Sequence, residues 1–342
     1  MTFLRISHMI NTIRKFGFFW DIMGGTMSIR ILGTGGFLPE KLMTNEDFET
    51  MIDTSDEWIT TRTGIKRRHY VQDGMDNAEM CAIAGKLALA QAGIEASDLG
   101  GIIVATVTPE MSVPSTAAQV QRALGVEKCV AFDVAAACSG FLYALKVAEG
   151  LLKEGGKPFL VCGSETLSRF MNMEDRASCV LFGDGAGAVV IEYGGNMKYF
   201  EVNSYPDTGH TIEINGMNTY RDGKLVPSLV SIKGKEVYVY STRESERVVK
   251  EALDALNMNT GDVDWFVFHQ ANARIIKTAA ERMGVSLDRF YINIDDTGNT
   301  SAASVPLVLD QMNRKGLLKK GDVLTIAAFG GGLTSGCAIY EW

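Results

Sequence analysis

Cys138 has the setting of a cysteine nucleophile. A β-rich run over 129–134 leads through small residues to this thiol, and apolar residues then recur at helical spacing. The sequence therefore places the thiol where a buried strand becomes a helix N-terminus, whose unpaired N–H groups and dipole favour a thiolate. Small neighbours leave room for a substrate carbonyl: Ala136, Ala137, Ser139 and Gly140. A single cysteine between alanines is more often a core residue, so this interpretation requires partner groups.

Two residues far along the chain are candidate partners. His269 follows an apolar, strand-like run over 265–268, and sites form at the carboxyl ends of strands in α/β sheets. Asn299 lies in the turn 296–301, which leads into a helix that an asparagine commonly caps. Each alone is typical of a structural residue. Together with Cys138, however, they fall at strand-to-helix turns of duplicated units, and symmetry would bring such turns to one edge.

The elements that must position these residues occur twice along the chain. Alternating strands and helices imply parallel central sheets covered by helices, so we expect an α/β fold of two similar halves, 27–196 and 197–342. The corresponding helices are 78–92 with 244–256, 117–124 with 277–283, and 139–153 with 302–314. The corresponding strands are 101–107 with 265–268, 129–134 with 290–294, and 159–162 with 323–328.

A glycine-rich turn also marks each half. The turn at 182–187 contains Gly-x-Gly-x-Gly but leads into another strand-like run. A phosphate-binding loop requires a helix N-terminus at that point, so a dinucleotide site is excluded. The second turn, 329–332, separates the strand-like runs 323–328 and 337–340. Both turns predict hairpins at which the backbone passes close to another group.

The bulk composition excludes several classes of protein. The net charge of −8, from 33 basic and 41 acidic residues, excludes a nucleic-acid surface and a polybasic membrane patch. Hydrophobic residues make up 46% of the chain, which is enough for a large core. The six cysteines form no Cys-x-x-Cys pair, which favours reduced thiols in a cytoplasmic protein over disulfides or a zinc site.

Residues 1–26 do not fit the pattern of the rest. Charged residues interrupt every apolar run there, so we expect neither a signal peptide nor a membrane span. A strand-like segment starts directly after Met27. We therefore interpret 1–26 as an extension upstream of the folded unit, or as a misassigned start. The intact mass of the natively expressed protein tests this, since a chain that begins at Met1 contradicts a misassigned start.

Several motifs, taken in order, resemble one enzyme family. The segments 54–59, 62–65, 133–141, 269–272, 298–304 and 328–332 are together similar to the β-ketoacyl-acyl carrier protein synthases III of bacterial fatty-acid synthesis. The likeness runs from Met27 to Trp342. It implies the thiolase-like fold, in which duplicated βαβαβαββ halves form five αβαβα layers, and a homodimer. It also implies condensation of an acyl-CoA, acetyl-CoA by default, with malonyl-acyl carrier protein, without a cofactor or metal.

The resemblance also implies a role for each candidate. Cys138 would hold the acyl group as a thioester, and the N–H groups of Cys138 and Gly331 would bind the carbonyl oxygen. His269 and Asn299 would donate hydrogen bonds to the malonyl thioester oxygen as loss of CO2 produces an enolate. Because an asparagine cannot titrate, Asn299 suits donation rather than proton transfer.

Other residues match binding positions of the family. Trp58 and Arg176 resemble the pair that sandwiches the adenine of CoA, and Arg62 resembles a neighbouring contact. Asn272 resembles a contact to the pantetheine arm. Three basic residues are candidate contacts for the acidic carrier protein, although a solvated helix face explains the last two equally well: Arg274, Lys277 and Arg282.

The acyl pocket and the exact primer are less constrained. Val113 stands where some relatives have a phenylalanine that shapes this pocket, and Phe329 is a second candidate wall, so acetyl, branched and longer primers stay open. A specialised-metabolite ketosynthase or acyltransferase of the same subfamily is the alternative function. Polyketide synthases typically have Gly-Phe-Gly-Pro-Gly where this chain has Ala-Phe-Gly-Gly-Gly at 328–332. Thiolases use a second catalytic cysteine near the C-terminus, but Cys337 lies in a strand-like run and is interpreted as a core residue. A papain-like hydrolase would lack the duplication.

Overall fold

The computed structural model describes residues 29–216 and 219–342, and a five-stranded sheet forms the centre of its first half. The predicted extension, 1–26, lies outside the described residues. β4 pairs in parallel with β5 and β6, whereas β7 is antiparallel to β6 and to β1, giving the order β1-β7-β6-β4-β5. The strands are β1 (Ile29–Phe37), β4 (Gly101–Ala105), β5 (Val130–Val134), β6 (Phe159–Glu165) and β7 (Gly185–Tyr193).

A four-stranded sheet in the second half repeats this order. β13 is parallel to β14, β15 is antiparallel to β14, and β8 is antiparallel to β15. Each strand therefore has the neighbours and directions of a strand of the first sheet, as expected from a duplication. The strands are β8 (Met197–Ser204), β13 (Trp265–Phe268), β14 (Val323–Gly330) and β15 (Thr334–Glu341).

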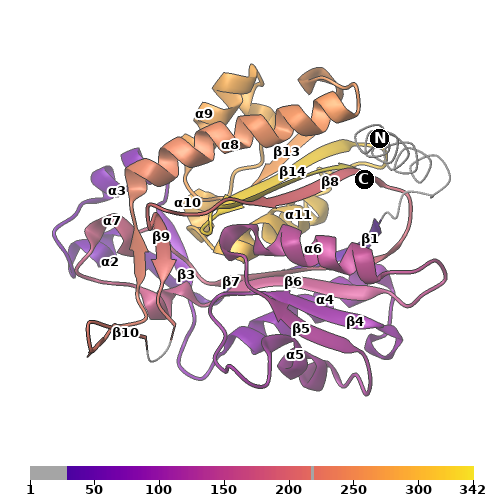
Figure 1. Ribbon diagram of the computed structural model, residues 1–342, viewed down its shortest axis with the longest axis horizontal. Helices are drawn as coiled ribbons and strands as arrows, with labels where there is room; N and C mark the ends of the chain where they lie inside the picture. The colour runs from indigo at the N-terminus through magenta and orange to yellow at the C-terminus, as the bar shows by residue number, and fades with distance from the viewer. Residues whose placement is uncertain (1–28, 217–218) are drawn as a thin grey trace, which may run out of the picture.

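Helices cover both sheets and separate them, which makes five layers (Figure 1). The outer helices of the first sheet are α4 (Asn77–Ala92) and α5 (Thr116–Leu124), and those of the second are α8 (Gly234–Ala255) and α9 (Ala273–Met283). The central layer consists of α6 (Gly140–Leu151) and α11 (Ser304–Arg314). One apolar cluster joins these two central helices to both sheets, so the central layer is the core of the molecule.

Three expectations about the elements differ most from the structure. No strand forms at 290–294: Phe290 makes a single bridge to Phe266, on which its ring stacks at 5.0 Å, and α10 (Ile294–Thr297) follows. The turn at 182–187 is not a hairpin, because the helix α7 (Arg176–Cys179) precedes it. The third error concerns α8, which begins ten residues before the predicted 244.

The early start of α8 has a structural cause. Its first turns carry β-branched and aromatic residues of low helix propensity, which the sequence pattern does not mark as helical. Tertiary contacts hold them: the Tyr238 and Thr278 hydroxyls lie 2.8 Å apart, and the Tyr240 hydroxyl donates to the Thr334 carbonyl at 3.0 Å. By contrast, the predicted strand 265–268 and helix 78–92 are confirmed to within one residue.

Short elements gather at one end of the molecule, at the left of Figure 1. They are α2 (Asn45–Glu49), α3 (Asp56–Thr63), β2 (Lys41–Thr44), β3 (Arg67–Tyr70), β9 (Ile212–Ile214), β10 (Tyr220–Arg221), β11 (Lys224–Leu225) and β12 (Val230–Ile232). The 3-10 helices are η1 (Ala96–Asp98), η2 (Ala137–Ser139), η3 (Leu167–Phe170), η4 (Thr260–Asp262), η5 (Leu287–Arg289) and η6 (Ser301–Ala303). Among the described residues, no helix has the length and apolar character needed to cross a membrane.

Candidate active site

A cavity of about 440 Å³ contains the three residues that the sequence singles out. Cys138, His269 and Asn299 all line it, and Trp58 and Arg62 line it as well. The thiol comes from the first half of the chain, whereas the imidazole and the amide come from the second. The structure therefore brings the three groups together in one cavity, as the sequence predicts.

The backbone around Cys138 is tightly constrained. The thiol lies in η2, one residue before Ser139 and directly after Ala137, which has a φ of +46°. Non-glycine residues rarely adopt this left-handed conformation, and they tend to do so at functional sites. At Gly330, the last residue of β14, a Cβ atom would lie 2.8 Å from the Cys138 nitrogen. Only glycine therefore lets the second sheet approach the nucleophile this closely.

Burial governs the protonation of Cys138. The pKa of the thiol is raised to about 11, mainly because burial removes water from around the sulfur and to a lesser extent because the Glu165 carboxylate lies nearby. A hydrogen bond with the Ser301 side chain acts in the opposite direction. The expectation that this position favours a thiolate is therefore wrong for the free enzyme, because burial keeps the thiol protonated.

His269 is a buried, neutral imidazole whose orientation is fixed. Burial lowers its pKa to about 3. Its Nδ1 atom lies 2.6 Å from the Ser304 hydroxyl, which accepts the Gln270 N–H at 3.3 Å. The Ser304 hydroxyl thus fixes the orientation of the ring, and a ring that accepts the Ser304 proton at Nδ1 carries its own proton on Nε2. Sequence reasoning gave Ser304 no role, because this contact joins residues that are distant in the chain.

Asn299 is held so that its amide NH2 group stays available. Its backbone N–H donates to the Leu181 carbonyl at 2.9 Å, and its carbonyl accepts from Gly183 at 3.1 Å. Its Oδ1 atom accepts the Ser301 N–H at 2.9 Å. The turn therefore uses the side-chain oxygen, which leaves the nitrogen as the donor toward the cavity. The N-cap of the following helix η6 is Thr300, so Asn299 stabilises the turn before that helix rather than capping it.

Trp58 stands at the cavity, and two arginines from different helices lie against its ring. The guanidinium carbons of Arg62 and Arg176 each lie 4.7 Å from the centre of its indole ring. Arg176 is anchored by a 2.8 Å hydrogen bond to the Asp53 carbonyl. This cluster of one aromatic ring and two cations suits a planar, anionic ligand.

Asn272 links this cluster to the helix that follows His269. Its side chain accepts the Arg274 N–H at 2.8 Å as the N-cap of α9, and it donates to the Arg62 carbonyl at 3.0 Å. Asn272 also lines the cavity. The helix start is thereby tied to α3, which carries both Trp58 and Arg62.

The three predicted carrier-protein contacts on α9 differ from one another. Arg274 lines the cavity and lies 5.5 Å from the Tyr238 ring. Lys277 is exposed on the same face of the helix. Arg282 forms a 2.8 Å ion pair with Glu246 of α8, so its charge is largely compensated. The structure therefore brings only Arg274 to the cavity.

The residues predicted for the acyl pocket also differ. Phe329 lines the cavity, with its ring 5.6 Å from that of His269. Val113 is 84% exposed and does not line the cavity, so the structure does not bring this predicted pocket residue to the site.

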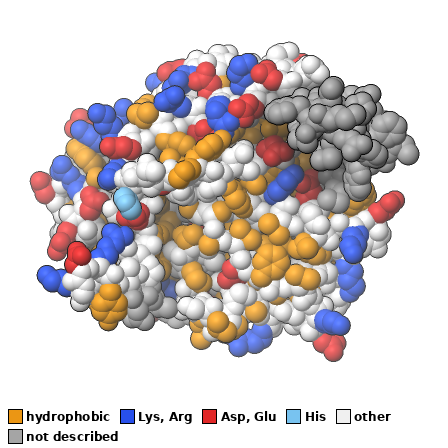
Figure 2. Space-filling view, in the orientation of Figure 1, with side chains coloured by type: hydrophobic (Ala, Val, Ile, Leu, Met, Phe, Trp, Pro, Cys, Tyr) orange, Lys and Arg blue, Asp and Glu red, His pale blue; other side chains and the backbone are white. Residues whose placement is uncertain are grey.

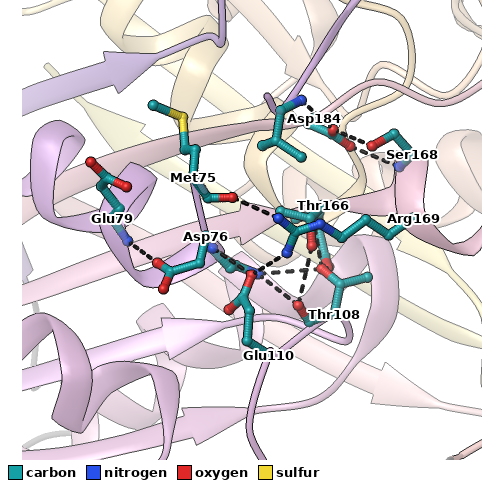
Figure 3. Close-up of polar contacts among 12 residues, drawn as sticks. Met75, Asp76, Glu79, Thr108, Glu110, Thr166, Ser168, Arg169 and Asp184 are labelled. Carbon is teal, nitrogen blue, oxygen red and sulfur yellow. Dashed lines mark hydrogen bonds and ion pairs between the residues drawn. The ribbon is translucent and has the colours of Figure 1, made fainter. Parts of the chain in front are cut away.

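A second cavity of about 600 Å³ adjoins the first. Gly331, the predicted second oxyanion donor, lines this neighbouring space together with Ala137. Arg169 also lines it, and donates to the Glu110 carboxylate at 3.0 Å and to the Met75 carbonyl at 2.6 Å (Figure 3). Within the described ranges, no cluster of three or more His, Cys, Asp or Glu side chains is arranged to hold a metal ion.

The chain is similar in sequence to one enzyme family over nearly its whole length. Residues 132–207 match the family of 3-oxoacyl-[acyl-carrier-protein (ACP)] synthase III, and residues 253–342 match its C-terminal family. The chain is 44% identical over 319 residues to the beta-ketoacyl-[acyl-carrier-protein] synthase III of Xylella fastidiosa, covering 92% of this chain and 98% of that one. With the enzyme of that name from Clostridium acetobutylicum it shares 42% identity over 322 residues, covering 92% and 99%.

Solved structures extend the likeness to the fold. The 3-oxoacyl-[acyl-carrier-protein] synthase III of Aquifex aeolicus superposes with a TM-score of 0.86 at 38% identity, covering 92% of this chain and 100% of that one. The priming β-ketosynthase of the R1128 polyketide pathway superposes with a TM-score of 0.86 at 30% identity, covering 92% and 96%. The expected thiolase-like fold is confirmed. The chain therefore belongs to the β-ketoacyl-acyl carrier protein synthase III family.

Proposed function

We propose that this enzyme condenses an acyl-CoA primer, acetyl-CoA by default, with malonyl-acyl carrier protein to start fatty-acid synthesis. The products are 3-oxoacyl-acyl carrier protein, CoA and CO2. The observation that carries the proposal is the meeting of Cys138, His269 and Asn299 in one cavity, together with Trp58 and its arginine neighbour Arg62. Side chains and backbone donors supply all of this chemistry, and no cofactor takes part in it.

In the first step, Cys138 attacks the acyl thioester and CoA leaves. A covalent acyl-enzyme divides one difficult reaction into two easier ones. The developing oxyanion needs preorganised donors, for which we propose the N–H groups of Cys138 and Gly331. The close approach of Gly330 to the Cys138 backbone supports this role, because it holds the 330–332 turn against the nucleophile.

In the second step, loss of CO2 from the malonyl group yields an enolate that attacks the acyl-enzyme. The Nε2–H of His269 and the amide NH2 of Asn299 are the proposed donors to the enolate oxygen. Their hydrogen-bond partners support this, because Ser304 and the Ser301 N–H occupy the opposite atoms of each side chain. Neutral donors suit this task, since an anion forms without any protein group having to change charge.

The two substrates would enter past different surfaces. The adenine of CoA would stack on Trp58 beside Arg62 and Arg176, and Asn272 would contact the pantetheine arm. The acidic carrier protein would dock on α9 near Arg274, with Lys277 and Arg282 as outer contacts. Phe329 would form part of the acyl pocket. Val113 is exposed and does not line this chain's cavity, so it would not shape the acyl pocket of its own chain.

We also propose a homodimer, which works in the cytoplasm. β5 is the last strand of its sheet, and Val130 on it is 45% exposed. Val147 and Leu151 of α6 are exposed as well, and hydrophobic side chains gather over this region in Figure 2. An unpaired edge strand beside apolar side chains is suited to pairing with a second copy. All six cysteines are unpaired, which agrees with a reducing compartment.

Mass spectrometry and product analysis test the proposed function. Incubation with acetyl-CoA should add one acetyl group to Cys138, and later addition of malonyl-acyl carrier protein should release a 3-oxoacyl product. The Cys138→Ala variant should carry no acyl group. Persistent labelling of that variant would refute Cys138 as the nucleophile. A panel of acetyl-, branched and longer acyl-CoA primers in the same assay defines the primer that the enzyme prefers.

A specialised-metabolite ketosynthase is the second candidate, favoured by the likeness to the priming β-ketosynthase of a polyketide pathway. That likeness has the same TM-score as the one to the Aquifex enzyme but a lower identity, 30% against 38%. The primer panel separates the two functions. Preference for acetyl-CoA supports initiation of fatty-acid synthesis, whereas rejection of acetyl-CoA in favour of an unusual primer supports the second candidate.

A further inference from the structure

A buried carboxyl group that the proposed mechanism does not use lies behind the nucleophile. Glu165 is the last residue of β6, and its side chain is 0% exposed. The hydrogen bonds that it accepts all come from neutral donors: the hydroxyls of Thr106, Thr108 and Ser301 and the N–H of Val107. A carboxylate buried among neutral donors is costly, so its presence needs a reason.

The two oxygens of Glu165 have different surroundings. Oε2 accepts the Thr108 hydroxyl at 2.5 Å and the Val107 N–H at 3.1 Å. The Thr108 oxygen itself accepts the Thr166 N–H at 2.9 Å (Figure 3). Because a carboxylate cannot donate, the Thr108 proton is directed at Glu165. Oε1 has only longer contacts, to the Ser301 hydroxyl at 3.4 Å and to Val107 at 3.3 Å. Oε1 is therefore the oxygen with room for a proton.

Ser301 connects this oxygen to the nucleophile. Its hydroxyl, which approaches Glu165, also hydrogen-bonds the Cys138 sulfur, and both Ser301 and Cys138 line the cavity. Ser301 has a φ of +49°, a left-handed conformation that a serine rarely adopts. Ala137, the residue directly before Cys138, has a similar φ of +46°. Two residues near the thiol thus hold a rarely populated backbone conformation, and one of them, Ser301, links the sulfur to a carboxyl group.

We propose that Glu165, acting through the Ser301 hydroxyl, accepts the Cys138 proton while the sulfur attacks the acyl-CoA. The S–H bond breaks as the sulfur bonds to the acyl carbon. Ser301 takes that proton and passes its own to Glu165 Oε1. The bond from the acyl carbon to the CoA sulfur then breaks, and the CoA thiolate recovers the proton by the reverse path. The products are acyl-Cys138, the CoA thiol and the Glu165 carboxylate, so protons balance.

This assignment rests on the proposed function, because it describes the acylation step. Glu165 does not touch the substrate and is a positioning and proton-accepting residue. Burial raises its pKa to about 7, so the carboxyl changes charge near neutral pH, where an efficient base should lie. His269 is a poorer acceptor, since burial lowers its pKa to about 3.

Among the charged and titratable groups near Cys138, Glu165 is the best-placed acceptor of the thiol proton. Cys138 approaches it from η2, and His269 faces the same cavity from the end of β13. The charged groups of the other elements that pack on β6 point to solvent or pair elsewhere: Glu79 and Lys86 of α4 are exposed, Lys146 pairs with Glu149 on α6, Glu192 of β7 pairs with Arg30, and Asp310 of α11 pairs with Arg314.

The pH dependence of acylation by acetyl-CoA tests the relay, with CoA release followed in a rapid mixer between about pH 5.5 and 9. In the parent enzyme the rate should fall as pH drops through about 7, because protonated Glu165 cannot accept a proton. Glu165→Gln should lose that limb and acylate about 100-fold more slowly at high pH. Ser301→Ala should show the same loss of rate and of the pH limb as Glu165→Gln. The double variant should acylate no more slowly than either single variant, because both residues act in the same proton path.

Glu149→Gln is the matched control, since Glu149 is also buried but pairs with Lys146 away from the cavity; it should keep the parent rate and pH limb. The relay is overturned if the Glu165→Gln variant keeps the parent acylation rate and pH limb. It is also overturned if that variant acylates faster than the parent, as loss of a nearby negative charge would allow. If Glu165→Gln does not fold, Ser301→Ala alone decides in the same way. A parent enzyme that never forms the acyl-enzyme overturns the proposed function instead, so the two failures are distinct.

Discussion

At the scale of single residues, burial sets the charge of the thiol and the imidazole in the cavity. It raises the pKa of Cys138 to about 11 and lowers that of His269 to about 3. A thiolate–imidazolium pair, as in papain-like hydrolases, would require the opposite order. Both groups are therefore neutral in the free enzyme near pH 7. This favours an imidazole that donates a hydrogen bond over one that shuttles a proton.

Removal of the two donors should affect the two half-reactions differently. His269→Ala and Asn299→Ala should form the acyl-enzyme at near the parent rate and should lose about 100–1000-fold in malonyl decarboxylation, or roughly 3–4 kcal/mol. Each half-reaction is measured separately, as CoA release and as CO2 release. His210→Ala is the control, because this exposed histidine pairs with Glu213. Equal losses in both half-reactions would contradict the division of roles.

At the scale of elements, the site depends on where strands end and helices begin. Sequence patterns predict these points well: β13 ends directly before His269, and α6 begins two residues after Cys138. Side-chain contacts between distant segments are not predictable in this way. The hydrogen bond from Ser304 to His269 spans 35 residues of sequence, and the approach of Glu165 to Ser301 spans 136. Both depend on tertiary packing that local periodicity does not encode.

The start of α9 should control recognition of the carrier protein. Arg274→Glu should raise the KM for malonyl-acyl carrier protein about tenfold, equivalent to roughly 1.4 kcal/mol, and should leave the KM for acyl-CoA unchanged. Arg282→Glu should have a smaller effect, because Glu246 already compensates that charge. Arg122→Glu on α5, in the opposite outer layer, is the control. The docking role fails if acyl-CoA is the substrate whose KM rises.

At the scale of the whole molecule, two sheets of matching strand order enclose one pair of helices. The duplication was readable from the sequence because helices and strands recur in the same order. The missing fifth strand of the second sheet was not, because Phe290 has the apolar character of a strand residue but packs by stacking on Phe266. The thiolase-like fold survives this loss, since the four remaining strands keep their order and directions.

The edge of the first sheet should be the dimer contact. Val130→Lys on β5 should convert the dimer to a monomer, because a lysine on an edge strand disfavours pairing with another strand. Leu87→Lys is the control, since Leu87 is similarly exposed, 48% against 45%, but lies on α4. Sedimentation or light scattering gives the molecular mass in each case. If only the Leu87 variant dissociates, the dimer contact does not lie at β5. A parent enzyme that is monomeric would contradict the proposed dimer itself.

The central pair of helices has a consequence for how this enzyme can change over time. α6 starts beside the nucleophile and α11 starts beside the two donors, and one shared apolar cluster fixes both. A gene that exchanged only one half with a distant relative would take the nucleophile from one parent and the two donors from the other, and the central apolar cluster would pack poorly. Recombination near residue 197 should therefore be tolerated only between parents whose central helices already pack well against each other.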